Sequence, residues 1–314
     1  MELSNHTTVT EFIIAGFPSL QKTRIPLFIL ILVMYTLTII GNIVIVFITS
    51  YDPSLNTPMY FFLRNFSFLE ICFTTVTVPT ILADLIREKN VMSFNCCLAQ
   101  IYFFHALGGI ECLLLAAMAY DRYVAICSPL RYNTIMNSIV YNQLSMWSWI
   151  TGLVLPLVPV FLISQLSYCG SNVVDHFFCD ILPLLRLVCN RTQLNEMLSF
   201  FICSFILVGS FTLTAISYAA ILIAVLGIHS SDGRKKAFST FASHLIVVGI
   251  FYGTMMFIYV RPTRNLSFIM DQLVAVFYCV ITPLLNPMIY TLRNKEVKKA
   301  LKKIVCKKLE DLQC

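Results

Sequence analysis

Charged residues are scarce in this 314-residue chain. Asp, Glu, Lys and Arg together make up 12% of it, whereas 58% of the residues are hydrophobic. The mean hydropathy is +0.80. Water-soluble domains carry about 25% charged residues. The composition therefore excludes a soluble globular protein and indicates a protein of the lipid bilayer.

The chain also lacks the residue groupings on which most catalytic sites depend. No nucleophile, base and orienting group converge in the sequence, and it has no glycine-rich loop that could hold a phosphate. Ser243 and His244 look like part of a hydrolase site, but adjacent residues on a helix point in different directions. We therefore expect no catalytic residues, no cofactor and no enzymatic activity.

A basic domain outside the membrane is missing as well. The net charge of +6 comes from short segments beside apolar runs, so it indicates contact with anionic lipids and not with DNA or RNA. Residues 1–20 lack a basic start followed by an apolar core. We expect no cleavable signal peptide, so that the first membrane span acts as the uncleaved signal.

Long apolar runs, in contrast, are abundant. Crossing about 30 Å of hydrocarbon takes roughly 20 apolar residues in a helix. The sequence predicts an all-α membrane protein in which a seven-transmembrane helix bundle occupies residues 25–292. The seven expected spans are residues 25–49, 59–82, 98–120, 141–163, 196–224, 238–260 and 272–292.

Basic residues predict the orientation of this bundle. Of the 22 Lys and Arg residues, eight lie between Arg293 and Lys308, and three more form the run Arg234–Lys236. Both regions should be cytoplasmic, although Lys22 and Arg24 argue the other way. The sequon at Asn5 needs the opposite side for glycosylation. We expect residues 1–24 to be extracellular, residues 293–314 to be cytoplasmic, and the protein to lie in the plasma membrane.

The C-terminal segment has the pattern of a short amphipathic helix. Val297, Leu301, Ile304 and Val305 recur at helical spacing with lysines opposite them. Such a helix lies on the anionic inner leaflet of the membrane. Cys306 is a candidate for lipidation there and equally a candidate for an unmodified thiol.

Four of the twelve cysteines fall on the expected outer side, where disulfides form. They are Cys97, Cys169, Cys179 and Cys189, and three pairings are open to them. Cys96 could compete with Cys97. A bridge from the third span to the loop after the fourth would hold that loop down as a lid. Zinc is the weaker alternative, because the ten-residue spacings lack close-paired ligands.

Polar side chains are also expected inside the membrane. Glu70 and Glu111 share a depth of roughly 15 Å at 1.5 Å per residue. Asn42 and Asn286 lie slightly nearer the cytoplasm. Buried acids are costly, so this cluster either holds a small cation with water or shares a proton that joins the helices. The sequence leaves both alternatives open and gives no firm metal site.

A charged pair stands at the end of the third span. Asp121 and Arg122 follow a long apolar segment directly, and a pair in that place can be held in one conformation and released in another. Near the inner end of the seventh span, Asn286-Pro287 should interrupt the helical hydrogen bonds and allow bending, which Pro283 favours further.

These elements resemble the rhodopsin-like G-protein-coupled receptors, and the finer motifs resemble the olfactory receptors among them. The matching motifs cover nearly the whole chain. They are Gly41-Asn42, Pro58–Leu63, Met118–Cys127, Ser217-Tyr218, Lys236–Leu245, Phe251–Gly253 and Pro283–Tyr290.

The resemblance implies a role for the charged pair and a pairing for the cysteines. Asp121 would hold Arg122 at rest and release it to meet the G protein. The residues assigned to this switch are Asp121, Arg122, Tyr123, Tyr218, Asn286, Pro287 and Tyr290. Cys97 would pair with Cys179, and Cys169 with Cys189. The chain departs from the family pattern at Glu70, where Asp is more common, and at Phe241, where Cys is common.

The resemblance also places a ligand pocket in the outer half of the third, fifth, sixth and seventh spans. The implied lining is mostly apolar, with His105 and Tyr259 able to form orienting hydrogen bonds. The implied residues are Phe104, His105, Gly108, Gly109, Cys112, Ile202, Ile206, Leu207, Tyr252, Met255, Met256, Tyr259, Val276 and Cys279.

The resulting hypothesis is an odorant receptor. It would bind small volatile or lipophilic molecules and activate a heterotrimeric stimulatory G protein of the olfactory type, which raises cAMP. One alternative is a rhodopsin-like receptor for a lipid or metabolite that is not an odorant. Another is an ion-coupled secondary transporter, suggested by the intramembrane acids but opposed by the lack of an internal repeat.

Overall fold

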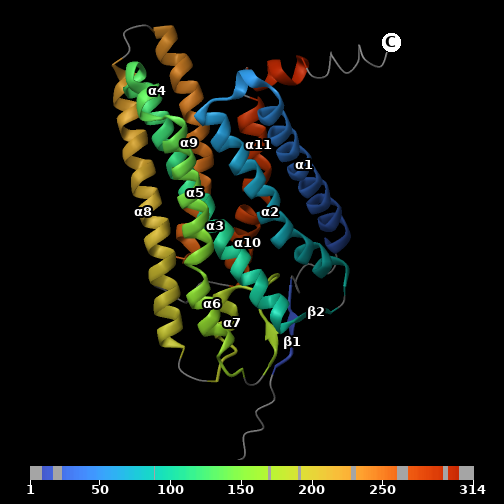
Figure 1. The fold of residues 1–314 in the computed structure, drawn as a ribbon. Coiled ribbons are helices and arrows are strands. Elements are labelled where there is room, and N and C mark those ends of the chain that lie inside the picture. Colours follow the sequence, from blue (N-terminus) through green and yellow to red (C-terminus); the bar gives the residue numbers. More distant parts are fainter. Residues whose placement is uncertain are drawn as a thin grey trace, which may run out of the picture.

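The computed structural model shows a bundle of membrane-length helices with a small β-sheet at one end (Figure 1). It describes residues 9–16, 23–87, 89–168, 171–189, 192–227, 231–259, 268–292 and 296–303. For residues 231–244, 268–269, Asp271 and residues 290–292 the description covers the backbone alone.

All seven expected spans are helical within the described residues, which confirms the fold class. The first three spans are α1 (Arg24–Tyr51), α2 (Pro58–Ile86) and α3 (Phe94–Cys127). The fourth is divided into α5 (Ser138–Val154) and α6 (Leu157–Ser164), and the fifth is α8 (Gln193–Leu226). The sixth is α9 (Ser231–Tyr259), and the seventh combines α10 (Phe268–Val276), the π-helical turn η4 (Phe277–Ile281) and α11 (Thr282–Leu292).

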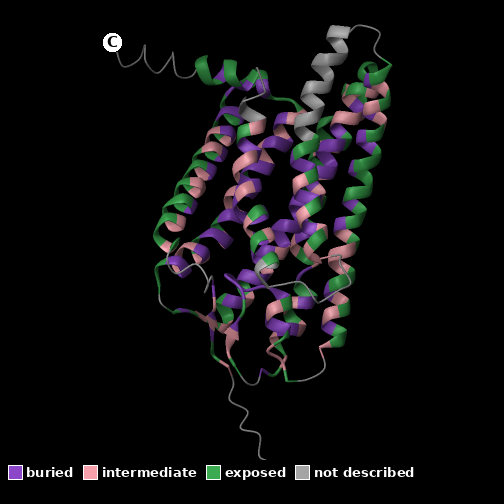
Figure 2. Cartoon of the chain, turned by 180° about the vertical axis from the view of Figure 1, so that it is seen from behind, coloured by how far each residue is buried: buried purple, intermediate pink, exposed green. Residues whose placement is uncertain are grey.

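Six of these spans are long and apolar enough to cross a bilayer by their described residues, and Leu245–Tyr259 gives α9 a shorter apolar length. α3 lies at the centre, packed against α2, α5 and α8. Its apolar window is 78% buried, whereas that of α1 is 22% buried. Figure 2 shows exposed residues along α1 and α8, and their exposed apolar residues include Ile25 and Phe205. Lipid is the natural surrounding for such faces.

Prolines explain two irregular places in the helices. α5 ends before Pro156, which cannot donate the backbone hydrogen bond that would continue the helix. In the seventh span α11 continues through Pro287, which lacks the N–H that would donate to the helical ladder. The departure from α geometry is η4, directly before Thr282 and Pro283. This irregular turn lies beside Pro283, the second proline that the sequence pointed to.

The β-sheet closes one end of the bundle, which we call the sheet end. It contains β1 (Glu11–Ile14), β2 (Asn90–Ser93) and β3 (Val173–Val174) in the order β2-β1-β3. β1 pairs antiparallel with β2 and parallel with β3. The short helix α7 (Ile181–Leu185) lies at the same end.

The opposite end, which we call the tail end, carries a helix at residues 296–303. Val297 and Ala300 are buried against the bundle, and Lys298, Lys299, Lys302 and Lys303 are exposed. Val297 is buried as expected, whereas Leu301, assigned to the same apolar face, is exposed. Ile304, Val305 and Cys306, on which the rest of that expectation fell, lie outside the described residues.

Candidate functional site

A disulfide ties the loop between the fourth and fifth spans to the bundle. Cys97, at the start of α3, is bonded to Cys179. Cys189 is also disulfide-bonded, and its neighbour Val188 forms a β-bridge with Tyr168. Its expected partner Cys169 lies outside the described residues, as does the glycosylation candidate Asn5. Cys96 is a free, exposed thiol.

Under this loop lies a narrow cavity of about 50 Å³ between α3, α6, α8 and α9. Its wall is almost entirely apolar. Ten of the residues assigned to the ligand pocket line it: Phe104, His105, Gly108, Gly109, Cys112, Ile202, Ile206, Leu207, Met255 and Tyr259.

The other four assigned residues do not line this cavity or the larger one described next. Tyr252 is buried, and its hydroxyl donates a hydrogen bond to the carbonyl oxygen of Cys112 at 3.1 Å, so it joins α9 to α3. Cys279 is fully buried, while Met256 and Val276 pack against the core. The π turn at η4 follows Val276 directly and shifts the helical register.

A larger cavity of about 490 Å³ adjoins the narrow one at the sheet end. The two share His105, Ile181, Ser199, Cys203 and Tyr259 in their linings. The larger cavity also has charged walls, to which Asp175, Asp180, Arg186 and Glu196 contribute. The described residues thus form an apolar recess beside an outer chamber whose mostly apolar wall also carries charged side chains.

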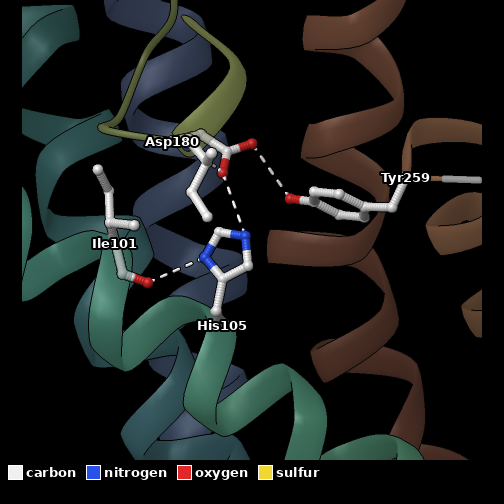
Figure 3. Close-up of polar contacts among 5 residues, drawn as sticks. Ile101, His105, Asp180 and Tyr259 are labelled. Carbon is white, nitrogen blue, oxygen red and sulfur yellow. Dashed lines mark hydrogen bonds and ion pairs between the residues drawn. The ribbon is translucent and has the colours of Figure 1, made fainter. Parts of the chain in front are cut away.

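Three polar side chains meet where the two cavities join (Figure 3). His105 Nδ1 lies 2.9 Å from the carbonyl oxygen of Ile101, and His105 Nε2 lies 3.5 Å from Asp180 Oδ1. Tyr259 donates its hydroxyl to Asp180 Oδ2 at 3.1 Å. The N–H of Ile181 donates to Asp180 Oδ1 at 2.7 Å, which makes Asp180 the N-cap of α7.

Asp180 was not among the residues assigned from the sequence. His105 and Tyr259 belong to long helices, where spacing places them, but Asp180 reaches the site because its neighbour Cys179 is bonded to α3. The position directly after a disulfide cysteine was the available signal. Pro156, Pro159 and Ile181 line the narrow cavity and were missed for a similar reason, since they belong to α6 and the loop.

At the tail end, the buried carboxylate of Asp121 accepts a hydrogen bond from the hydroxyl of Tyr132 at 2.8 Å. Tyr132 begins the short helix α4 (Tyr132–Ile135). Burial raises the pKa of Tyr132, and its hydrogen bond to Asp121 raises that pKa further, so the phenol keeps the proton that it donates.

No ion pair between Asp121 and Arg122 within 4.0 Å is found among the described side chains, so their role as a switch stays a prediction. α3 continues to Cys127, so Asp121 and Arg122 are both inside the helix and diverge as adjacent helical residues do. Tyr218 on α8 is buried and Tyr123 is half-buried. The side chain of Tyr290 lies outside the description.

The mid-bundle polar cluster is partly assembled. Asn286 Nδ2 donates to Glu70, which joins α11 to α2, and Glu111 is buried nearby on α3. Asn42 donates to Thr38 within its own helix at 3.0 Å. Glu70 Oε2 and Asn286 Oδ1 have no hydrogen-bond partner among the described atoms. Two such oxygens suit a cation or a shared proton equally, and no metal-binding group of three His, Cys, Asp or Glu occurs among the described residues.

Seven helical spans that cover an apolar recess at one end, and that carry the buried Asp121 next to Arg122 at the other, define a membrane receptor of the rhodopsin-like class. The family model described as "Olfactory receptor" matches residues 31–308. The chain therefore belongs to the olfactory receptor family.

Individual relatives match over nearly the whole chain. Identity is 47% over 303 residues to olfactory receptor 6N1 of Homo sapiens, covering 96% of this chain and 97% of that protein. It is 49% over 308 residues to olfactory receptor 226 of Rattus norvegicus, covering 96% and 94%. It is 46% over 308 residues to olfactory receptor 5AR1 of Mus musculus, covering 98% and 99%.

Membership of this family makes the chain a multi-pass membrane receptor and not an enzyme. The family implies odorant ligands and coupling to a G protein. The transporter alternative is set aside by the same finding.

Proposed function

We propose that this receptor binds a small lipophilic odorant at the sheet end and activates a stimulatory G protein of the olfactory type at the tail end, which raises cAMP. The observation that carries the proposal is the apolar recess between α3, α8 and α9, covered by the loop that Cys179 ties to α3. Removing apolar ligand surface from water in such a recess is favourable.

The proposed orientation places the sheet end outside the cell and the tail end in the cytoplasm of cells that carry the receptor in the plasma membrane. A disulfide at the sheet end suits an oxidising compartment. The exposed lysines of residues 296–303 suit the anionic inner leaflet.

The test is a cAMP reporter in cells that display the receptor and express the olfactory-type stimulatory G protein. A broad odorant panel should contain agonists that raise cAMP. Arg122→Ala should reach the surface and give no response to those agonists, because the arginine is proposed to meet the G protein. The exposed Arg87 lies at the sheet end, so Arg87→Ala is the matched control and should respond normally.

Two results would contradict the proposal in different ways. Normal signalling by surface-displayed Arg122→Ala would remove the assignment of the switch. A receptor that reaches the surface and responds to no member of the panel, with any G protein supplied, would contradict odorant-driven coupling itself.

A further inference from the structure

A positively charged side chain lies inside the second span. Arg64 is the seventh residue of α2, which begins with Pro58 at the tail end. At 1.5 Å per residue it lies about 9 Å along the helix. Its side chain is half-buried. A charge at this depth in a membrane helix is costly unless a polar group meets it, so such an arginine points to a functional site.

The protein supplies no opposite charge for Arg64. Its guanidinium carbon lies 5.5 Å from the centre of the Phe61 ring, and no ion pair of Arg64 within 4.0 Å occurs among the described side chains. The neighbouring helix α5 contains no charged residue. Glu70, further along α2, is fully buried and accepts from Asn286. An aromatic ring attracts a cation only weakly, so the N–H donors of the guanidinium are left for a group outside the chain.

Aromatic side chains surround the arginine where α2 packs against α5. Phe61, Arg64 and Phe68 recur at helical spacing on one face of α2. The ring centre of Phe61 lies 4.8 Å from that of Tyr141, and the ring centre of Phe68 lies 6.0 Å from that of Trp149. Phe68 is 51% exposed, and the other four side chains are half-buried. These five residues, which we call the α2–α5 seam, are thus accessible from the surroundings of the bundle.

The seam combines hydrogen-bond donors at its tail end with an apolar surface beyond them. Tyr141 packs on the same ring as Arg64, and its hydroxyl hydrogen-bonds to no described group. A guanidinium and a phenol beside each other suit a phosphate, since charge-assisted hydrogen bonds to phosphate are strong. Phe68 and Trp149 lie further from the tail end, at the depth of an acyl chain. A phospholipid has both parts in this order.

The charge of the seam selects among phospholipids. A zwitterionic lipid would bring its own ammonium group close to Arg64, and like charges repel. A phosphatidylglycerol head brings the phosphate without a second cation. An anionic phospholipid therefore neutralises the arginine best.

We propose that the α2–α5 seam binds an anionic phospholipid of the leaflet at the tail end, with the phosphate on Arg64 and Tyr141 and one acyl chain along Phe68 and Trp149. None of the seam residues lines either cavity. The inference goes beyond the proposed function and uses only its orientation, because anionic lipids are concentrated in the cytoplasmic leaflet.

The tryptophans of the chain allow a local measurement. There are two, Trp147 and Trp149, and both belong to α5. Trp147→Phe leaves Trp149 as the single fluorescent reporter at the seam. The purified full-length receptor with this substitution is placed in nanodiscs of phosphatidylcholine that contain a minor fraction of brominated lipid, either phosphatidylglycerol or phosphatidylcholine. Bromine on the acyl chain quenches tryptophan on contact. At equal mole fraction, brominated phosphatidylglycerol should quench Trp149 more strongly, because the seam enriches it.

Substitutions of Arg64 test the charge. Arg64→Gln keeps a long polar side chain and should weaken the preference for phosphatidylglycerol at least about fivefold, the effect of one basic residue beside anionic lipid. Arg64→Lys should keep part of the preference, since an ammonium attracts phosphate but lacks the forked donors. Arg87 is exposed at the sheet end of the same helix. Arg87→Gln is the matched control and should retain the full preference.

The results decide the proposal without reference to signalling. Equal quenching of Trp149 by the two brominated lipids overturns the site, and this comparison needs no substitution at Arg64. An unchanged preference in Arg64→Gln, or an equal loss in Arg87→Gln, also overturns it. A preference that is lost in Arg64→Gln and kept in Arg87→Gln supports the site. A receptor that selects phosphatidylglycerol in this way but gives no cAMP response contradicts the proposed signalling alone.

Discussion

Tyr132 shows how a single side chain can complete a motif that the sequence marks only in part. The Asp121-Arg122 pair is recognisable from its neighbours along the chain, but the phenol that binds Asp121 lies 11 residues further on. It returns to α3 only because the turn at η3 (Pro129–Arg131) leads into α4. No local pattern predicts that return, so the sequence did not reveal Tyr132 as the hydrogen-bond partner of Asp121.

Tyr132→Phe should destabilise the receptor at this point. The ring still fits, but the carboxylate of Asp121, 2% exposed, loses its donor. Leaving a buried acceptor unpaired costs about 1–3 kcal/mol. We expect a lower melting temperature in detergent and fewer receptors at the cell surface.

Tyr120→Phe provides the comparison for that experiment. Tyr120 lies on the same helix end and is 39% exposed, so its hydroxyl can find water or lipid head groups. Loss of the Tyr120 hydroxyl should therefore change the melting temperature little. Equal effects of the two substitutions would mean that the bond between Tyr132 and Asp121 does not stabilise the fold.

Among the elements, the contact between α3 and α5 depends on the absence of a side chain at Gly152. A Cβ there would lie 2.4 Å from Ile110 Cγ1, 2.8 Å from Ile110 N and 2.9 Å from the carbonyl oxygen of Ala106. Two of these atoms belong to the backbone of α3 and cannot rotate away. The two helices therefore approach as closely as they do because residue 152 is glycine.

Gly152→Ala should force α5 away from α3 at a cost of about 1–3 kcal/mol, as overpacking does in other cores. The measurement is the melting temperature, together with odorant potency, because Gly109 in the recess faces Gly152.

The matched control is Gly209→Ala on α8, where a Cβ would meet nothing within 4 Å. That substitution should be neutral or slightly stabilising, since alanine is the better helix former by about 1 kcal/mol. If Gly152→Ala and Gly209→Ala changed the melting temperature equally, close packing of α5 on α3 would not explain why residue 152 is glycine.

The helices differ in how well their positions and their cavity-lining residues could be predicted from the sequence. Apolar length predicts the seven spans, and ten of the fourteen pocket residues that the resemblance implied line the recess. The seventh span was predicted less well, because the π turn at η4 changes which residues face inward. Val276 and Cys279, which the resemblance assigned to the pocket, line neither cavity.

At the scale of the whole molecule, β1 connects parts of the chain that are distant in sequence. It pairs with β2 before α3 and with β3 in the loop after α6. Just after β1, Gly16 adopts φ +62°, and its carbonyl accepts a hydrogen bond from Gln272 of α10 at 2.7 Å. Strands of two to four residues leave no strong pattern, so the sequence did not predict this sheet.

Gly16→Ala should disturb the sheet end twice over. A positive φ costs a residue with a Cβ roughly 1–2 kcal/mol, and the Cβ would lie 1.8 Å from Asp84 Oδ2. We expect reduced surface display and a lower melting temperature.

Adding Asp84→Ala to Gly16→Ala removes the collision but not the backbone strain, so it should restore part of the loss relative to Asp84→Ala alone. The absence of any restoration would show that the collision contributes nothing.

The central place of β1 also sets an order of events during synthesis. Asn172 donates to the carbonyl oxygen of Glu11 across a separation of 161 residues. At about 5–20 residues per second, translation leaves that edge of β1 without its partner for roughly 10 to 30 seconds. An open strand edge is prone to pair with other chains. The first strand to leave the ribosome is thus among the last to be completed, and a receptor truncated before residue 172 would keep that edge open permanently.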